Sequence, residues 1–241
     1  MELTETLRRN RSLSKPRGSV CGGDTRTFQQ AMLAWYKKNR RDYLWRLQDD
    51  PYRILVAEIM LQQTNADKVE PVYTEFIARY PSVSVLVQSG LHDIRELLSP
   101  LGLGYRAARI KNIVEKLVIE HGGAVPSVEK SLLALPGIGR YVANAVLCFA
   151  YSQRVALVDV NIVRLYGRVF GFRSQKNRPR DDNKVWEFAT EMLPKTKFKE
   201  YNLALLDFTA TVCTSRRPDC VKCPITDICL YYTRSGEING N

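Results

Sequence analysis

Apolar residues recur every three or four positions through most of the chain, the spacing expected for one buried face of an α-helix. The first such set, Phe28, Met32 and Trp35, begins just after a polar N-terminal stretch. Strict alternation of apolar and polar residues, which would predict β-strands, is never sustained. The sequence therefore predicts an all-α fold. Roughly ten helices are expected, one from Thr27 onward, two within 54–77, and one each within 83–98, 107–120, 127–135, 141–150, 160–170, 183–193 and 201–213.

The first 24 residues differ from the rest of the chain. They are polar and basic, and Pro16, Gly18, Gly22 and Gly23 interrupt them, so we expect a mobile basic tail over 1–24. They also lack the apolar core of a secretion signal. No apolar run approaches the roughly 20 residues that span a bilayer. These features predict a cytoplasmic protein without a membrane anchor.

The charge of the chain is strongly positive. Lysine and arginine total 36 against 25 acidic residues, which gives a formal net charge of +11. Basic proteins bind polyanions because each phosphate that they neutralise releases condensed counterions. A solvated basic surface without a specific partner would have the same charge. Charge alone therefore leaves nucleic acid binding and a plain basic surface as equal interpretations.

A Pro-Gly-Ile-Gly turn at 136–139 separates two of the predicted helices. Glycine permits the positive φ values and the close backbone approach that a tight interhelical turn requires. The turn would also expose the amides of Gly137 and Gly139 at a helix N-terminus, where anions bind. Arg140, directly after it, could add a charged contact. The residues alone allow either a phosphate-binding hairpin or an ordinary corner packed into the core.

The six cysteines are unevenly placed. Cys21 and Cys148 are isolated, whereas the other four share one short stretch with the spacing C-x6-C-x2-C-x5-C, namely Cys213, Cys220, Cys223 and Cys229. A disulfide scaffold would spread its cysteines along a shorter, secreted chain. Clustered thiolates instead predict a metal site, and either tetrahedral zinc or an iron–sulfur cluster would suit them.

Two acidic residues stand in apolar surroundings. Glu58 falls within an apolar helical run, where a carboxylate is costly unless it is paired or functional. It could also face solvent from the helix surface. Asp159 is flanked by Val158 and Val160 at the start of a predicted helix, a position that suits a helix cap as well as a catalytic carboxylate. The residues themselves leave these alternatives open.

Five motifs occur in an order that resembles the endonuclease III and MutY superfamily of DNA glycosylases. They are E-I-M-L-Q-Q-T from residue 58, L-G-L-G-Y-R-A from 101, L-P-G-I-G-R-Y from 135, V-D-V-N-I-V-R from 158, and the four-cysteine run from 213. The resemblance covers about residues 27–232. It implies a two-lobed helix–hairpin–helix fold over 25–241. Its six-helix lobe would span about 50–150, and its cluster lobe, with a C-terminal iron–sulfur loop, about 25–49 plus 151–241.

The resemblance implies an enzyme that excises a base from double-stranded DNA. Gly137, Gly139 and Arg140 would hold the backbone phosphates of one strand without reading sequence, with room for a monovalent cation at the hairpin. Asp159 would stabilise the positive charge that develops on the deoxyribose, supported by Asn161. The four cysteines would hold a 4Fe–4S cluster. The expected partner is DNA with a mismatched or damaged base, bound by a monomer at the nucleoid.

The same resemblance assigns roles around the target base. Glu58 would protonate the base, and Gln62 would fill or probe the space that a flipped base leaves. Tyr105 would insert between bases as a wedge, and Arg106 would contact the opposite strand. Tyr141 stands where bifunctional members carry a lysine that forms an imine with the sugar. A phenol cannot form an imine, so we expect an abasic product without strand cleavage.

Within the superfamily, the thymine-DNA glycosylases of the T·G mismatch type resemble this chain in several features. These are the glutamate, the tyrosine after the hairpin, the L-D-F-T-A-T-V-C run from residue 206 and an end soon after the cysteines. We therefore expect removal of thymine, and of uracil, opposite guanine. The alternatives are a MutY-like adenine glycosylase acting on A·G or A·8-oxoguanine, an endonuclease III-like glycosylase with lyase activity, and a catalytically silent DNA-binding protein. MutY proteins usually carry a further C-terminal domain and a serine where Tyr141 stands.

Overall fold

The computed structural model describes residues 22–102 and 104–238, and the regular structure in these ranges is entirely helical. The all-α prediction is therefore confirmed. Twelve α-helices and five short 3-10 turns occur in the described ranges. The α-helices are α1 (Gly22–Asn39), α2 (Pro51–Leu61), α3 (Ala66–Arg79), α4 (Val83–Val87), α5 (Leu91–Leu98), α6 (Tyr105–His121), α7 (Glu129–Leu133), α8 (Arg140–Phe149), α9 (Val160–Phe170), α10 (Asn183–Glu191), α11 (Phe198–Thr211) and α12 (Leu230–Ile238).

The ends of the chain differ in part from the sequence-based prediction. Most of the basic tail expected over 1–24 lies outside the described residues, and α1 already begins at Gly22. Helix α12 was not predicted, because its sequence L-Y-Y-T-R-S-G-E-I has no apolar periodicity. No helix in the described part of the chain combines the length and the apolar character needed to cross a bilayer.

Capping residues explain where several helices begin and end. Asp50 caps α2 by accepting a hydrogen bond from the amide of Arg53 at 2.9 Å, and Pro51 occupies the first helical position. Gly90 precedes α5, so that the single run expected over 83–98 forms two helices. Helix α6 ends at Gly122, whose φ of 59° is left-handed and therefore suits glycine.

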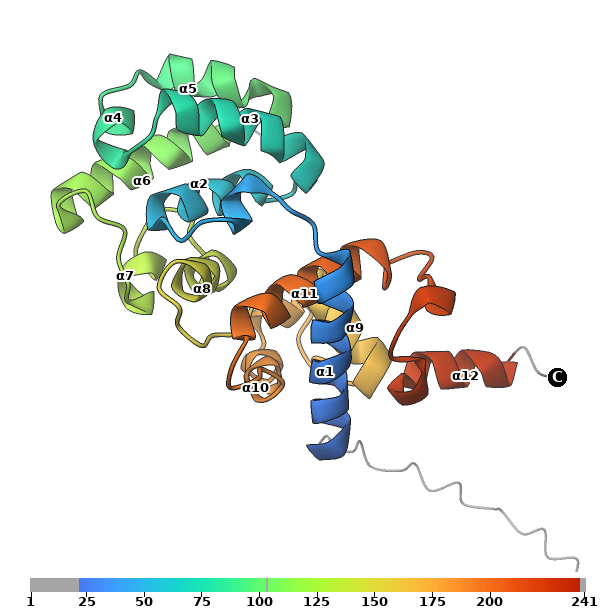
Figure 1. The fold of residues 1–241 in the computed structure, drawn as a ribbon. Coiled ribbons are helices and arrows are strands. Elements are labelled where there is room, and N and C mark those ends of the chain that lie inside the picture. The colour runs from blue at the N-terminus through green and yellow to red at the C-terminus, as the bar shows by residue number, and fades with distance from the viewer. Residues whose placement is uncertain (1–21, 103, 239–241) are drawn as a thin grey trace, which may run out of the picture.

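Two separate hydrophobic cores give the molecule two lobes (Figure 1). The first core, between Tyr43 and Leu147 in sequence, belongs to helices α2–α8, which we call the hairpin lobe. The second core combines residues of α1 with residues of α9–α11 and of the segment that follows α11, which we call the cluster lobe. Helix α1 packs against α11 and crosses it in Figure 1, so the N-terminal helix joins the C-terminal part of the chain. The chain therefore crosses between the lobes twice, before α2 and after α8.

Helix α8 lies at the junction of the two lobes. Its residues Tyr141 and Phe149 pack against both hydrophobic cores. Since α8 starts directly after the Pro-Gly-Ile-Gly turn, the hairpin and the first turn of α8 lie where the lobes meet.

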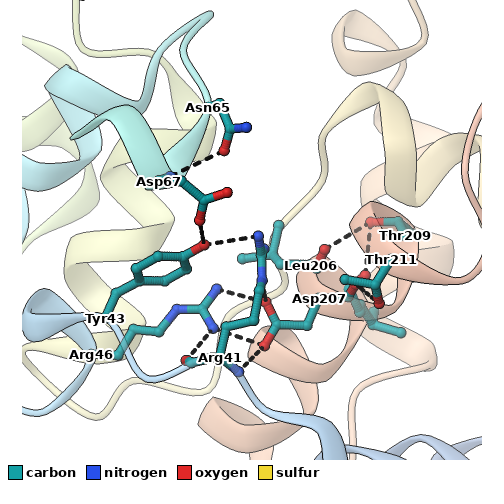
Figure 2. A network of polar contacts seen from close by, with 10 residues as sticks. Arg41, Tyr43, Arg46, Asn65, Asp67, Leu206, Asp207, Thr209 and Thr211 are labelled. Carbon is teal, nitrogen blue, oxygen red and sulfur yellow. Dashed lines mark hydrogen bonds and ion pairs between the residues drawn. The ribbon is translucent and has the colours of Figure 1, made fainter. Parts of the chain in front are cut away.

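A buried ion-pair network fastens the lobes beside this junction (Figure 2). Asp207 on α11 is fully buried, and its carboxylate accepts hydrogen bonds from Arg41 Nε at 2.7 Å and from Arg46 Nη1 at 2.8 Å. Tyr43, between the two arginines in sequence, donates to Asp67 on α3 at 2.5 Å. Burial lowers the pKa of Arg46, but the hydrogen bonds and charge of Asp207 outweigh it and leave this pKa above its usual value. The network thus connects α11 of the cluster lobe to α3 of the hairpin lobe.

Replacing Asp207 by asparagine should strongly destabilise the protein. Two guanidinium groups would remain at a buried site without their counter-charge, which typically costs about 3–5 kcal/mol. The measurement is the free energy of unfolding from denaturant titration. Asp42→Asn is the matched control, because the Arg40–Asp42 pair is exposed on both sides and such pairs contribute about 1 kcal/mol or less. Equal effects of the two substitutions would contradict the importance of the buried network.

Candidate active site

A cavity of about 310 Å³ opens where the two lobes meet. Its walls come from the segment before α2, from α2 and α8 of the hairpin lobe, and from α11 of the cluster lobe, and include Trp45, Arg46, Glu58, Tyr141, Lys199 and Leu206. Apolar and aromatic side chains combined with a few polar groups are typical of a site for a small molecule or a single base.

Glu58 is the buried carboxyl group of this cavity. It lies on α2 with 6% of its surface exposed, which excludes the interpretation of a solvent-facing helix residue. Burial raises its pKa to about 7, and the nearby charge of Arg46 opposes this rise only in part. A substantial fraction of Glu58 is therefore protonated near neutral pH, where it can donate a proton.

Tyr141 is within electrostatic range of two carboxyl groups, those of Glu58 and Asp159. Burial raises the pKa of its hydroxyl well above the usual value, and the charges of Glu58 and then Asp159 raise it further. Both acidic residues are therefore close enough to act on this one phenol. The structure thus brings together Glu58, Tyr141 and Asp159, which are far apart in sequence.

Asp159 caps α9 and acts electrostatically on Tyr141, although it is not one of the residues that line the cavity. Its Oδ1 accepts hydrogen bonds from the amides of Asn161 at 2.9 Å and Ile162 at 2.7 Å. Its Oδ2 accepts a third from Asn161 Nδ2 at 2.8 Å. Donors at a helix N-terminus stabilise a negative charge. The capping bonds hold a carboxylate whose charge acts on Tyr141, so the roles of helix cap and functional carboxylate do not exclude one another.

A line of hydrogen bonds leads from Asp159 to the cysteine segment. Arg164 Nη1 donates to Asn161 Oδ1 at 2.7 Å, and its Nη2 donates to the carbonyl of Cys213 at 2.8 Å. Asn161 therefore bridges Asp159 and Arg164. Hydrogen bonds through Asn161 and Arg164 thus link the carboxylate of Asp159 to the backbone at Cys213, the first of the four clustered cysteines.

The hairpin has a buried and an exposed side. Ile138 is buried in the core of the hairpin lobe, whereas Gly137, Gly139 and Arg140 are exposed. Gly137 has a φ of 71°, which explains the need for glycine there. Arg140 lies over the ring of Trp186, with its Cζ 4.3 Å from the ring centroid. The turn is thus part of the core and also presents amides and a cation to solvent.

The four clustered cysteines line one small cavity in the cluster lobe, next to α9. Arg168 of α9 donates to Cys213 Sγ at 3.4 Å. Burial, and to a smaller extent the other three cysteines, raise the pKa of Cys223 to about 11, so the four thiols are close neighbours. In the described ranges, no group of three or more His, Cys, Asp or Glu side chains is arranged to bind a single metal ion.

The sequence profile described as "HhH-GPD superfamily base excision DNA repair protein" matches residues 56–191. This range begins in α2 and ends in α10, and it contains Glu58, the hairpin and Asp159. It spans more than half of the chain. The chain belongs to the HhH-GPD superfamily.

Within this HhH-GPD superfamily, the chain is similar to several archaeal proteins over almost their full length. It is 36% identical to a thymine/uracil-DNA glycosylase of Pyrobaculum aerophilum, covering 90% of this chain and 96% of that protein. It is 37% identical to a thymine-DNA glycosylase of Aeropyrum pernix, with 87% and 96% covered. Among solved structures, a thermostable thymine-DNA glycosylase superposes with a TM-score of 0.83 at 34% identity, with 88% and 98% covered.

Of the two DNA contacts predicted at 105 and 106, one differs in the structure. Tyr105 is exposed at the start of α6, as a wedge requires. Arg106 is fully buried, and its guanidinium donates to the carbonyl of Gln62 and to Thr64 Oγ1, so the predicted contact with the opposite DNA strand is wrong for this conformation. The sequence-based reasoning missed Arg109, which bonds to Gln62 Oε1 at 2.6 Å. Arg109 follows Arg106 by one helical turn, and this spacing could have indicated that both lie on the same face of the helix.

Glu58→Gln should change how stability depends on pH. The pKa of Glu58 is about 7 in the folded protein against an ordinary value of 4.5, so the folded state binds its proton more tightly. The resulting stabilisation is present below pH 4.5 and is lost as pH rises through 7, by on the order of 3 kcal/mol. Glutamine cannot ionise and should not show this loss.

The measurement is the free energy of unfolding of both proteins between pH 5 and 8, at about one-unit steps. Glu75→Gln, at an exposed position of α3, serves as the control and should follow the wild type. A constant difference between wild type and Glu58→Gln across this range would contradict the raised pKa.

Proposed function

We propose that this HhH-GPD protein is a monofunctional DNA glycosylase that hydrolyses the N-glycosidic bond of thymine, and of uracil, opposite guanine. The main support is the interlobe site, where the buried Glu58 and the helix-capping Asp159 both act on Tyr141. The names of the archaeal relatives favour the same substrates. An enzyme of this kind works on chromosomal DNA, which assigns it to the nucleoid of the cytoplasm.

Asp159 would act on the sugar. Breaking the bond between base and deoxyribose builds positive, oxocarbenium-like charge at C1′. A carboxylate held by three hydrogen bonds needs little rearrangement to stabilise that charge, which is the condition for strong electrostatic catalysis. The same carboxylate can orient a water whose oxygen attacks C1′, and accept its proton.

Glu58 would act on the leaving base. Thymine departs with negative charge shared between its ring nitrogen and carbonyl oxygens, and a neutral carboxyl group can donate a proton to it. The raised pKa of about 7 keeps part of Glu58 in this neutral form near neutral pH. Two carboxyl groups in different surroundings thus take opposite roles, one as proton donor and one as anion.

Tyr141 supports the monofunctional assignment. Strand cleavage by a lyase route starts with an amine that attacks the sugar carbon and forms an imine. Tyr141 holds the position after the hairpin, and its raised pKa keeps the phenol neutral. Lys199 also lines the cavity, but its Nζ donates to the carbonyl of Phe149 at 2.8 Å. Hydrolysis leaving an intact abasic strand is therefore the expected outcome.

DNA binding would use the exposed side of the hairpin. Gly137, Gly139 and Arg140 present amides and a cation suited to the phosphates of one strand, and a monovalent cation at the turn stays a prediction. The target base must leave the stack to reach the cavity, which costs a few kcal/mol, least for a mismatched pair. Gln62 and Tyr105 would offset this cost by occupying the vacated space.

Asp159→Asn should abolish excision while leaving DNA binding intact. Asparagine is also a good helix cap, so α9 should keep its start, but the charge that stabilises C1′ is lost. We expect excision from a T·G duplex to fall by at least about a hundredfold under single-turnover conditions. Asp181→Asn, at an exposed position, is the control and should excise at the wild-type rate.

The substrate panel for this experiment contains T·G, U·G, A·G and A·8-oxoguanine duplexes, followed by alkali. Alkali-dependent breaks at T·G and U·G are expected. Breaks only at the adenine mismatches would replace the proposal by adenine glycosylase activity. Breaks without alkali would overturn the monofunctional assignment, and no breaks at all would favour a DNA-binding protein without activity.

We also propose that Cys213, Cys220, Cys223 and Cys229 hold a 4Fe–4S cluster. The four thiols line one cavity, and Arg168 beside Cys213 offers a positive charge to an anionic cluster. When bound, such a cluster would fix the loop between α11 and α12. Through Arg164 and Asn161 it would also steady the carboxylate of Asp159.

Metal analysis of the purified protein tests this assignment. We expect about four iron and four sulfide ions per chain, whereas about one zinc ion per chain would establish the alternative. Cys220→Ser should lower the iron content and the unfolding temperature. Cys148→Ser, in the isolated buried cysteine, is the control and should keep its iron.

A further inference from the structure

Arg109 on α6 touches all three segments that the proposed function places against DNA. Its Nη1 donates to Gln62 Oε1 at 2.6 Å. Its Cζ lies 4.9 Å from the centroid of the Tyr105 ring. The same side chain lies flat against Gly137, so that a Cβ added to this glycine would be 2.7 Å from Arg109 Cζ. The half-buried side chain of Arg109 thus connects Gln62, Tyr105 and the hairpin at Gly137.

Arg106, one helical turn earlier on α6, is buried and binds the loop that follows α2. It donates to the carbonyl of Gln62 and, at 2.7 Å, to Thr64 Oγ1. Between these residues, Gln63 has a left-handed φ of 58°, an unfavourable conformation for a side-chain-bearing residue. Arg106 therefore fixes the backbone of this loop, and Arg109 directs the side chain of Gln62.

We propose that Arg109 is a positioning residue that presents Gln62 and Tyr105 to the duplex as one preformed unit in fixed register with the hairpin. This inference rests on the proposed glycosylase function. Ordering a glutamine side chain costs rotamer entropy. Contacts that order both side chains before binding remove this cost from the extrusion step, which makes insertion more favourable.

The chemistry of arginine suits this role. A planar guanidinium can donate to Gln62 through its edge while its face lies on the Tyr105 ring. An ammonium group is a compact point charge and cannot make both contacts in the same way. Gly137 has a second reason to be glycine, because a side chain there would push Arg109 out of its place.

The test separates base extrusion from DNA binding. The variants are Arg109→Met, which keeps an apolar stem, and Arg109→Lys, which keeps the charge. Arg95→Met, at an exposed arginine of α5, is the matched control for the loss of one charge. Extrusion is followed by stopped-flow fluorescence of 2-aminopurine placed beside a T·G mismatch. Single-turnover excision is measured on that duplex and on thymine opposite a tetrahydrofuran abasic analogue.

We expect both Arg109 variants to slow extrusion and T·G excision by about tenfold or more. Their affinity for an undamaged duplex should stay within about threefold of the wild type, as for Arg95→Met. Thymine without a partner base is already cheap to extrude, so the defect there should shrink to less than about threefold. In a Gln62→Ala, Tyr105→Ala background, Arg109→Met should add less than about twofold, because Arg109 acts through these two residues.

An equal defect on paired and unpaired thymine, a loss of duplex affinity beyond that of Arg95→Met, or full activity of Arg109→Lys would each overturn the proposal. A lowered unfolding temperature together with equal defects would mark Arg109 as merely structural. If the wild type excises thymine from no duplex, the proposed function fails. The fluorescence experiment still tests Arg109 in that case, since extrusion requires no bond cleavage.

Discussion

The structure depends on one buried carboxylate, that of Asp207. It holds Arg41 and Arg46 from the segment that enters the hairpin lobe, although Asp207 itself belongs to α11 of the cluster lobe. A buried charge of this kind is tolerable only with partners of opposite charge, so separating the lobes at this point would be costly. Arg46 is both a support of the junction and a part of the cavity wall.

The electrostatics of the site follow from this arrangement. Arg46, which is paired with Asp207, opposes the rise in the pKa of Glu58 only in part, so this carboxyl group is partly protonated near pH 7. Asp159 lies in different surroundings, where amides at a helix N-terminus donate hydrogen bonds to its carboxylate. The charges of both acids act on Tyr141. The two carboxyl groups thus differ in their surroundings, through burial on one side and helix capping on the other.

Much of this organisation could be predicted from the sequence, and the remainder depends on contacts between distant segments. Periodicity located the helical segments, and membership of the superfamily is confirmed. Asp207 belongs to the L-D-F-T run that resembles the thymine-DNA glycosylases. The residues around it in sequence do not reveal that its partners lie more than 160 residues away. The contact of Arg106 with DNA was implied only by the resemblance of the L-G-L-G-Y-R-A segment to the wedge loop of the superfamily. The burial of Arg106 depends on the loop at Gln62, which sequence does not place.

The double crossing of the chain between its lobes also bears on how a substrate can enter. The lobes are joined by two chain connections, and Asp207 forms ion pairs with one of them, so we expect little opening motion between the lobes. The cavity between them would then keep nearly the same shape when DNA binds. In that case the DNA must deform to fit the protein. Base pairs that deform easily would therefore be recognised more readily than stable ones.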